Sequence, residues 1–191
     1  MLNDYKSWKA QGEMNYSVIR EYDIANGPGC RTTLFVSGCR NHCKGCFQPE
    51  TWDFSYGKLY DETTEHFLLD CLEPDYVSGL TILGGDPFEE ENQPPLAGLL
   101  EKVRARYQDR KSIWAYTGYI YERDLREGGR KFTDAALRML RCLDVLVDGP
   151  FIQEKKDLSL QFRGSANQRI LDMPKTLAAG KGVLATMYKC L

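Results

Sequence analysis

Short runs of β-branched and aromatic residues alternate along the chain with stretches in which apolar residues recur at helical spacing. Residues 32–36, Thr-Thr-Leu-Phe-Val, form the first run and stop at Ser37-Gly38, which predicts a buried strand. The same pattern recurs at residues 77–83, 112–116 and 144–147. Each of these runs ends at polar or glycine residues, so we expect four buried strands.

Three amphipathic stretches between these runs predict helices. The first is expected between Thr63, a residue type that caps helix N-termini, and Pro74, which ends the pattern. The second opens at Pro94-Pro95, and the third is capped by Thr133. The expected inward-facing residues are Phe67, Leu68, Cys71 and Leu72 in the first helix, Leu96, Leu99, Leu100 and Val103 in the second, and Ala136, Leu137 and Leu140 in the third.

The resulting order βαβαβαβ is typical of an α/β fold, in which helical crossovers join parallel strands. Ligands of such sheets bind at the carboxyl ends of the strands. Four polar or glycine-rich stretches should therefore converge on one rim: Ser37-Gly38-Cys39, Gly84-Gly85-Asp86, Thr117-Gly118-Tyr119 and Asp148-Gly149. Residues 1–14 are polar and irregular, so we expect an N-terminal extension followed by a single domain over residues 15–191.

The length of the chain excludes some folds, and its charge disfavours some partners. The 191 residues are enough for one well-filled domain but fall short of the roughly 250 residues of a complete eight-stranded β/α barrel. Lys and Arg number 25 against 27 Asp and Glu, a balance that disfavours nucleic acid and an anionic membrane as partners. No segment is apolar enough for a membrane span, and the first residues lack the pattern of a signal peptide, so we expect a cytoplasmic protein.

The cysteines are the residues most suggestive of chemistry. There are seven, an odd number in a compartment expected to be reducing, which disfavours a disulfide framework. Cys39, Cys43 and Cys46 follow the first strand with the spacing CxxxCxxC. Three soft thiolate ligands so close together favour zinc or an iron-sulfur centre. A fourth ligand is not evident unless His42 or Cys30 folds back, and three small buried residues without metal are the simplest alternative.

The number of cysteine ligands favours an iron-sulfur centre over zinc. Structural zinc normally has four protein ligands, whereas an iron-sulfur cluster held by three cysteines leaves one iron open to substrate. The three cysteines therefore favour an iron-sulfur cluster that takes part in chemistry. The alternative from another class of function is a small zinc-binding or redox-relay module without catalysis.

The motifs around the cysteines resemble those of the radical S-adenosylmethionine enzymes, and among them the activases of glycyl-radical enzymes. The resemblance extends over about residues 14–171. It is carried by Gly27-Pro-Gly29, Leu34-Phe-Val-Ser-Gly-Cys39, Gly45-Cys46-Phe47, Gly84-Gly85-Asp86-Pro87, Asp144-Val-Leu-Val-Asp-Gly149-Pro-Phe and Phe162-Arg-Gly-Ser-Ala-Asn-Gln168. The last three segments are similar to those of the activases of anaerobic ribonucleotide reductase.

The resemblance implies a site for a 4Fe-4S cluster and for S-adenosylmethionine as cosubstrate. By the family pattern the three cysteines hold three irons, and the amino and carboxylate groups of the cosubstrate chelate the fourth. Gly84, Gly85 and Asp86 would contact the amino group, and two residues without a Cβ allow the backbone to approach a ligand closely. Glycine at position 45 fits the reductase activases, and Phe47 would cover the adenine.

Three further contacts to the cosubstrate follow from the same resemblance. Asp148 ends the fourth strand, where related activases of pyruvate formate-lyase have a carboxylate followed two residues later by lysine. Pro150 replaces that lysine here, so the group that binds the cosubstrate's carboxylate is left unassigned. Thr117 and Asn167 would contact hydroxyl groups or the ribose, with an ordinary turn threonine and a satisfied loop amide as the alternatives.

Other polar residues and cysteines near these motifs are expected to have no catalytic role. His66 should be solvated in the first turn of its helix, and the sequence assigns no proton transfer to His42. Solvated positions are also expected for Glu89-Glu90-Glu91 and Lys155-Lys156, and a packing role alone for Cys30, Cys71, Cys142 and Cys190.

The reaction that the resemblance implies is activation of another protein. A reduced cluster would cleave S-adenosylmethionine to methionine and a 5′-deoxyadenosyl radical, which abstracts hydrogen from a glycine of anaerobic ribonucleotide reductase. A low-potential donor such as a flavodoxin would reduce the cluster. The alternative within the enzymes is an activase of pyruvate formate-lyase or another glycyl-radical enzyme. The implied fold is a partial, open β/α barrel of about five or six mostly parallel strands, of radical S-adenosylmethionine type.

Overall fold

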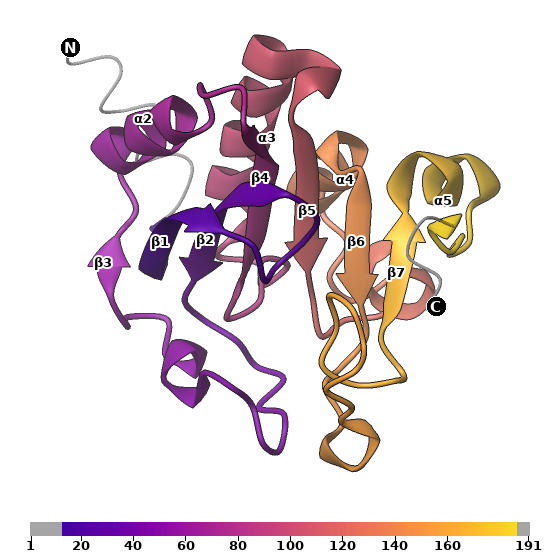
Figure 1. The fold of residues 1–191 in the computed structure, drawn as a ribbon. Coiled ribbons are helices and arrows are strands. Elements are labelled where there is room, and N and C mark those ends of the chain that lie inside the picture. Colours follow the sequence, from indigo (N-terminus) through magenta and orange to yellow (C-terminus); the bar gives the residue numbers. More distant parts are fainter. Residues whose placement is uncertain (1–12, 187–191) are drawn as a thin grey trace.

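A single seven-stranded sheet organises the protein. The computed structural model describes residues 13–186, and the strand order is β3-β1-β2-β4-β5-β6-β7 (Figure 1). The strands are β1 (Asn15–Asp23), β2 (Cys30–Val36), β3 (Lys58–Leu59), β4 (Val77–Gly84), β5 (Ser112–Tyr116), β6 (Val145–Asp148) and β7 (Arg169–Asp172). The α-helices are α2 (Glu62–Cys71), α3 (Gln93–Tyr107), α4 (Asp134–Cys142) and α5 (Met173–Ala179). Short helical turns cover Pro49–Trp52, Gln108–Arg110, Tyr121–Leu125 and Gln153–Lys155.

The four predicted strands form the parallel centre of this sheet. They are β2, β4, β5 and β6, and α2, α3 and α4 connect them in turn, which confirms the α/β arrangement. The sheet is larger than the five or six strands expected, because β1, β3 and β7 extend its two sides and pair antiparallel. It is also open, with β3 and β7 as its outermost strands.

The additional strands are short or exposed, which explains why the apolar pattern did not indicate them. β3 has two residues and β7 has four. β1 has nine residues, but Arg20, Glu21 and Tyr22 are exposed, so no continuous apolar run marks it. An antiparallel strand needs burial on one face only, whereas a central parallel strand is buried on both.

Side-chain capping hydrogen bonds mark the starts of α2 and α4. The Asp61 carboxylate accepts a hydrogen bond from the Thr64 backbone N–H at 2.8 Å and begins α2, so the prediction of Thr63 as the cap is wrong. The Thr133 hydroxyl accepts from the Ala136 N–H at 3.0 Å, which confirms the predicted cap of α4. An N-cap side chain satisfies one of the backbone donors that the first helical turn leaves without a partner.

Most of the residues expected to face inward are buried; the exceptions are Phe67, Leu137 and the half-buried Cys71. Phe67 of α2 is 44% exposed, and Leu137 of α4 is only half-buried. Leu69 and Met139 contribute to the core instead. Successive helical residues are rotated by about 100° from each other, so an error of one position moves a side chain off the buried face.

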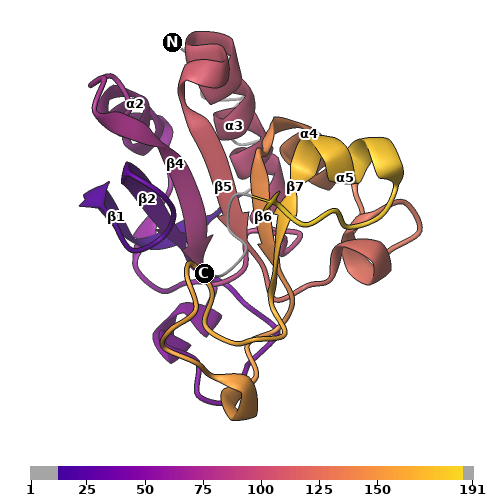
Figure 2. The same cartoon turned by 45° about the vertical axis from the view of Figure 1, so that its right-hand side comes forward.

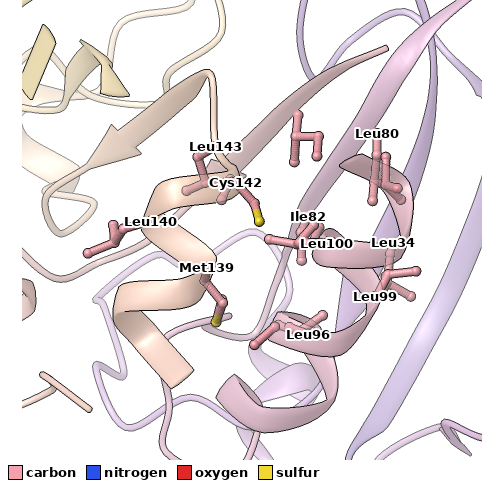
Figure 3. Packing of buried hydrophobic residues seen from close by; sticks show 14 of the residues in the cluster. Leu34, Leu80, Ile82, Leu96, Leu99, Leu100, Met139, Leu140, Cys142 and Leu143 are labelled. Atoms are coloured by element: carbon pink, nitrogen blue, oxygen red, sulfur yellow. The ribbon is translucent and has the colours of Figure 1, made fainter. Parts of the chain in front are cut away.

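Strand alternation divides the apolar residues into two layers, because successive side chains of a strand point to opposite faces. Ile113 and Ala115 of β5 join the large core beneath the helices, whereas Trp114 lies on the other face with Val145 and Val147. Figure 3 shows part of the large core, in which α3, α4 and the strands contribute Leu96, Leu99, Leu100, Met139, Leu34, Leu80 and Ile82. Burying one such leucine stabilises the fold by roughly 1.5–3 kcal/mol.

The long loops gather at one end of the sheet. Residues 37–57 follow β2 and residues 149–168 follow β6, and both loops lie below the strands in Figures 1 and 2. This end contains the carboxyl ends of all four parallel strands, so the loops are placed where the sequence predicts a ligand site.

Two predictions concern the ends of the chain. The N-terminal extension over residues 1–14 stays a prediction, because residues 1–12 lie outside the described residues; Met14 itself is buried in the core. Cys190 also lies outside them. None of the helices within residues 13–186 is both long and apolar enough to cross a membrane.

The cap of α2 gives a direct test of this fold. Asp61→Ala should lower the free energy of unfolding by about 1 kcal/mol, because the Thr64 N–H then loses its acceptor. Thr63→Ala is the matched control and should change it by less than about 0.5 kcal/mol. Urea unfolding of the metal-free protein, followed by circular dichroism, measures both. Equal losses in the two variants would contradict Asp61 as the cap.

Candidate functional site

Backbone hydrogen bonds join the end of β2 to the end of β4. The Gly85 N–H donates to the Val36 carbonyl at 2.7 Å, and the Asp86 N–H donates to the Gly38 carbonyl at 2.8 Å. A Cβ on Gly85 would lie 2.5 Å from the Gly38 oxygen. Any residue other than glycine at position 85 would therefore push the two segments apart.

The ends of β5 and β6 are joined in the same way. The Thr117 N–H donates to the Val147 carbonyl at 2.9 Å, and the Gly149 N–H donates to the Tyr119 carbonyl at 2.8 Å. The Thr117 hydroxyl also donates to Asp86 at 2.8 Å, which links this half of the sheet to the first. The four strand ends thus converge on one rim, as the sequence predicts.

A cavity of about 600 Å³ opens at this rim and extends along the face of the sheet opposite the helices. Its volume lies within the range of roughly 300–1,000 Å³ that is typical of small-molecule sites. Of the residues assigned to the site from sequence, the lining includes Cys39, Cys43, Cys46, Phe47, Gly84, Gly85, Asp86 and Thr117. It does not include Gly45, Asp148 or Asn167.

The loop that carries the cysteines is fixed by its own backbone and by an aromatic pair. The Cys39 N–H donates to the Trp52 carbonyl at 3.2 Å, and the Cys46 N–H donates to the Cys43 carbonyl at 3.0 Å. The His42 ring stacks on Trp52 with 4.6 Å between the ring centroids, and His42 has a left-handed backbone conformation with φ 44°. These contacts turn His42 away from the cavity, which it does not line.

Asp86 is the buried carboxyl group at the centre of the rim. It accepts hydrogen bonds from the Asn41 side chain at 2.8 Å, the Gly118 N–H at 2.8 Å and the Phe88 N–H at 3.0 Å, in addition to Thr117. Burial raises the pKa of Asp86 to about 7, against the lowering effect of these donors. Asp86 therefore titrates near neutral pH.

Gly45 and Phe47 anchor the cysteine loop to the loop after β6. Gly45 has φ 74°, a left-handed conformation that favours glycine, and the Gln153 side chain packs closely against it. The Phe47 ring is 5.2 Å from the Phe151 ring, and the Lys156 Nζ lies 5.1 Å from the Phe47 centroid. Phe47 is 64% exposed, so part of its side chain is available to a ligand or partner.

Asp148 and Asn167 belong to a structural connection rather than to the cavity wall. The buried Asp148 carboxylate accepts from Arg169 at 2.8 and 2.5 Å and from the Tyr121 N–H at 2.9 Å. The Asn167 amide donates to the Pro150 carbonyl at 2.8 Å. These bonds tie β7 to the end of β6 and shape the loop between them.

The three thiols fit a cluster with one open iron. Cys39 is buried and Cys43 and Cys46 are half-buried on the same wall, which contains neither His42 nor Cys30 as a fourth ligand. Burial, followed by Asp86, raises the pKa of the Cys39 thiol to about 12, so metal binding must displace its proton. Within residues 13–186 no three metal-binding side chains surround a single ion position. An iron-sulfur cluster does not need such an arrangement, because each cysteine binds a different iron.

The sequence analysis missed several residues at this end of the sheet. Glu89, expected to be solvated, is fully buried and hydrogen-bonded to Arg40, so that prediction is wrong. His66 is exposed, as predicted. Arg20, Tyr116 and Arg163 line the cavity. Strand alternation indicates Tyr116, because it shares a face with Trp114, but no local pattern indicates the arginines.

Comparison with known proteins defines the class to which this site belongs. The family model described as a 4Fe-4S single cluster domain matches residues 25–171. This range includes the three cysteines and the rim around them. The chain is thus a member of that family, and the match favours an iron-sulfur cluster over zinc.

Close relatives define the family more narrowly. The chain is 42% identical over 160 residues to a Haemophilus influenzae protein, covering 82% of the chain and 97% of the relative. It is 39% identical over 157 residues to a protein of phage T4 and 37% identical over 157 residues to one of Escherichia coli strain K12, covering 93% and 96% of those relatives and 82% and 81% of the chain. All three are named anaerobic ribonucleoside-triphosphate reductase-activating protein, and the chain belongs to this family.

The shifted pKa of Asp86 predicts a pH dependence of stability. A carboxyl group with a pKa of about 7 in the folded protein and an ordinary value of 3.8 in the unfolded chain stabilises the fold most below pH 3.8. Its contribution declines as the pH rises from about 4 to about 7. The unfolding free energy of the native protein minus that of Asp86→Asn should therefore decline over the same pH interval when it is measured by urea titration. A difference that is constant or increases would contradict the raised pKa.

Proposed function

We propose that this chain activates an anaerobic ribonucleoside-triphosphate reductase by generating a glycyl radical on it. The observation that carries the proposal is the meeting of three cysteines and the Gly84-Gly85-Asp86 rim in one cavity, in a chain whose relatives bear the name of such activators. The chain is then a radical-generating enzyme whose substrate is another protein.

Cys39, Cys43 and Cys46 would hold three irons of a 4Fe-4S cluster, with S-adenosylmethionine on the fourth. When bound and reduced, this cluster supplies the electron that cleaves the cosubstrate to methionine and a 5′-deoxyadenosyl radical. The protein positions the reacting groups and excludes competing reactions. The open sheet supports a partial barrel of the radical S-adenosylmethionine type, with the cosubstrate at the carboxyl ends of its strands.

The rim provides acceptors for the ammonium group of the cosubstrate. Gly84 and Gly85 expose backbone at the end of β4, and the Asp86 carboxylate lies beside them on the same cavity wall. Thr117 donates its hydroxyl hydrogen to Asp86, so it orients this acceptor. Phe47 would cover the adenine, a role supported by its exposure at the cavity next to Cys46.

The carboxylate of the cosubstrate needs a cation that Pro150 cannot supply. Arg20 on β1 and Arg163 in the loop after β6 line the cavity, and a guanidinium binds a carboxylate through two parallel hydrogen bonds. These two arginines are the candidates for that contact. Asp148 and Asn167 contribute indirectly, by shaping the loop that carries Arg163.

The open side of the sheet provides access for a partner. The cavity reaches from the cysteines past Arg20, in the middle of β1, to Asn26 in the loop before β2. The helices of the described part pack on the other face of the sheet. A glycine-bearing loop of the reductase would enter the cavity. The electron would come from a low-potential donor, with a flavodoxin as the expected class, because the reaction consumes one electron per cleavage.

An anaerobic mixing experiment tests this function. The reconstituted protein should bind about four irons per chain and release 5′-deoxyadenosine on reduction in the presence of S-adenosylmethionine. With anaerobic ribonucleotide reductase added, electron paramagnetic resonance should detect a glycyl radical, and with pyruvate formate-lyase it should not. A radical on the lyase alone would transfer the proposal to that partner. Stoichiometric zinc without visible absorbance would exclude both.

A cysteine substitution tests the ligand assignment. Cys43→Ala should abolish the visible absorbance of the cluster and the formation of 5′-deoxyadenosine, because one iron loses its only protein ligand. Cys71→Ala is the matched control, since Cys71 is also half-buried but lies on α2 outside the cavity. It should retain both properties. Retained cleavage in Cys43→Ala would show that another residue is the ligand.

A further inference from the structure

Glu89 is a fully buried carboxylate with four donors. Its Oε1 accepts from the Arg40 backbone N–H at 2.8 Å and from the Tyr119 hydroxyl at 2.7 Å. Its Oε2 accepts from the Arg40 guanidinium at 2.8 Å and from the Lys131 Nζ at 2.9 Å. Burial disfavours the charged form, but the hydrogen bonds from Tyr119, Lys131 and Arg40 outweigh this effect and lower the pKa of Glu89. Glu89 is therefore an anion at neutral pH.

The position of Glu89 links three segments around the first cysteine. Arg40 directly follows Cys39 in the loop, Tyr119 follows the end of β5, and Lys131 precedes α4. Arg40 also lies over the Phe54 ring, 4.3 Å from its centroid. Glu89 is the only residue of the described part that hydrogen-bonds both the backbone and the side chain of Arg40.

Residues 86–92, the segment that contains Glu89, form hydrogen bonds with the residues on both sides of Cys39. The Asn92 amide donates to the Ser37 carbonyl at 2.9 Å. The Asp86 backbone holds Gly38, and the Asp86 side chain accepts from Asn41. Together with Arg40, every residue from 37 to 41 except the cysteine itself is hydrogen-bonded to this segment.

The charged groups around Glu89 are three carboxylates and two cations, and they differ in exposure to water. Arg40 also pairs with Glu91 at 2.5 Å, and Lys131 also lies 3.6 Å from Glu90. The Glu90 side chain is 63% exposed and that of Glu91 is 43% exposed, so water screens both. Of the three carboxylates, Glu89 is the one whose charge lies in a low-dielectric environment, where its effect on a neighbouring centre is strongest. The Lys131 side chain beside it is only 11% exposed, so both charges of this ion pair are poorly screened by water.

We propose that Glu89 is a positioning residue for the cluster: through Arg40 it fixes Cys39, and its buried charge lowers the reduction potential. The proposal rests on the cluster of the proposed function. Adding an electron makes the cluster more negative, so a nearby fixed anion opposes reduction, and net charge and hydrogen bonding are known determinants of such potentials. The electron donor must therefore be a stronger reductant than the same cluster would need without Glu89.

The substitution Glu89→Gln removes this charge while keeping the size of the side chain. A glutamine has one acceptor oxygen where Glu89 has two. Two donors therefore lose their acceptor on this side chain: either the Arg40 N–H and the Tyr119 hydroxyl, or the Arg40 guanidinium and Lys131. We expect the reduction potential of the reconstituted protein to shift in the positive direction. We also expect the electron paramagnetic resonance spectrum of the reduced cluster to change, and iron to be lost to a chelator about tenfold faster.

Glu90→Gln is the matched control, because it removes the same charge from the adjacent, exposed position. Its potential, spectrum and iron retention should equal those of the native protein. If Glu89→Gln behaves like this control while the native protein forms its cluster, the inference is overturned and the proposed function stands. If the native protein itself binds no cluster, the proposed function fails and the inference with it.

Lys131→Met is the second variant, and it keeps the test valid if Glu89→Gln does not fold. It removes a cation and leaves both hydrogen bonds from Arg40 to Glu89 in place. The potential should then shift in the negative direction. Simple loss of structure would not produce shifts of opposite sign in the two variants. An unchanged or positively shifted potential in Lys131→Met would overturn the proposal.

Discussion

The site depends on the hydrogen bonds between the end of β2 and the segment after β4. Parallel strands leave polar backbone groups at their carboxyl ends, and buried groups of this kind must be paired. Here the Val36 and Gly38 carbonyls find their donors on Gly85 and Asp86. This pairing brings the cysteine loop against the glycine-rich segment, and it requires glycine because a Cβ on Gly85 would meet the Gly38 oxygen. One backbone constraint thus places the proposed cluster ligands and the proposed acceptors for the cosubstrate on the same wall.

The parallel centre of the fold was predictable from sequence, whereas its edges were not. Central strands such as β4 are buried on both faces and appear as continuous apolar runs, and the residues after them necessarily meet at one rim. β1 and β7 pair antiparallel at the sides, where one face or a few residues suffice, so their sequences carry no comparable signal. The start of α2 was misassigned because Asp61 and Thr63 are both suitable capping types, and only backbone geometry selects between them.

The candidate site was predictable to the extent that spacing determines it. The three cysteines and the Gly84-Gly85-Asp86 segment follow directly from strand ends, and the cavity contains them. Glu89 was misread because a run of three glutamates is the usual pattern of a solvated surface, and its partner Arg40 lies 49 residues away in sequence. Pairings over such distances depend on how the loops are packed, which no local pattern encodes.

Asp86 and Glu89 lie three residues apart, yet their surroundings give them opposite properties. Asp86 receives only neutral donors, so burial dominates and raises its pKa to about 7. Glu89 receives two cations besides Tyr119, so its pKa is lowered although it is equally buried. If the proposed cosubstrate binds beside Asp86, its ammonium group would favour the ionised form of this carboxyl group, because a nearby cation lowers the pKa. Glu89, with its lowered pKa, stays an anion at neutral pH. In this interpretation one short segment after β4 provides both a ligand-responsive acceptor and a permanent field around the first cysteine.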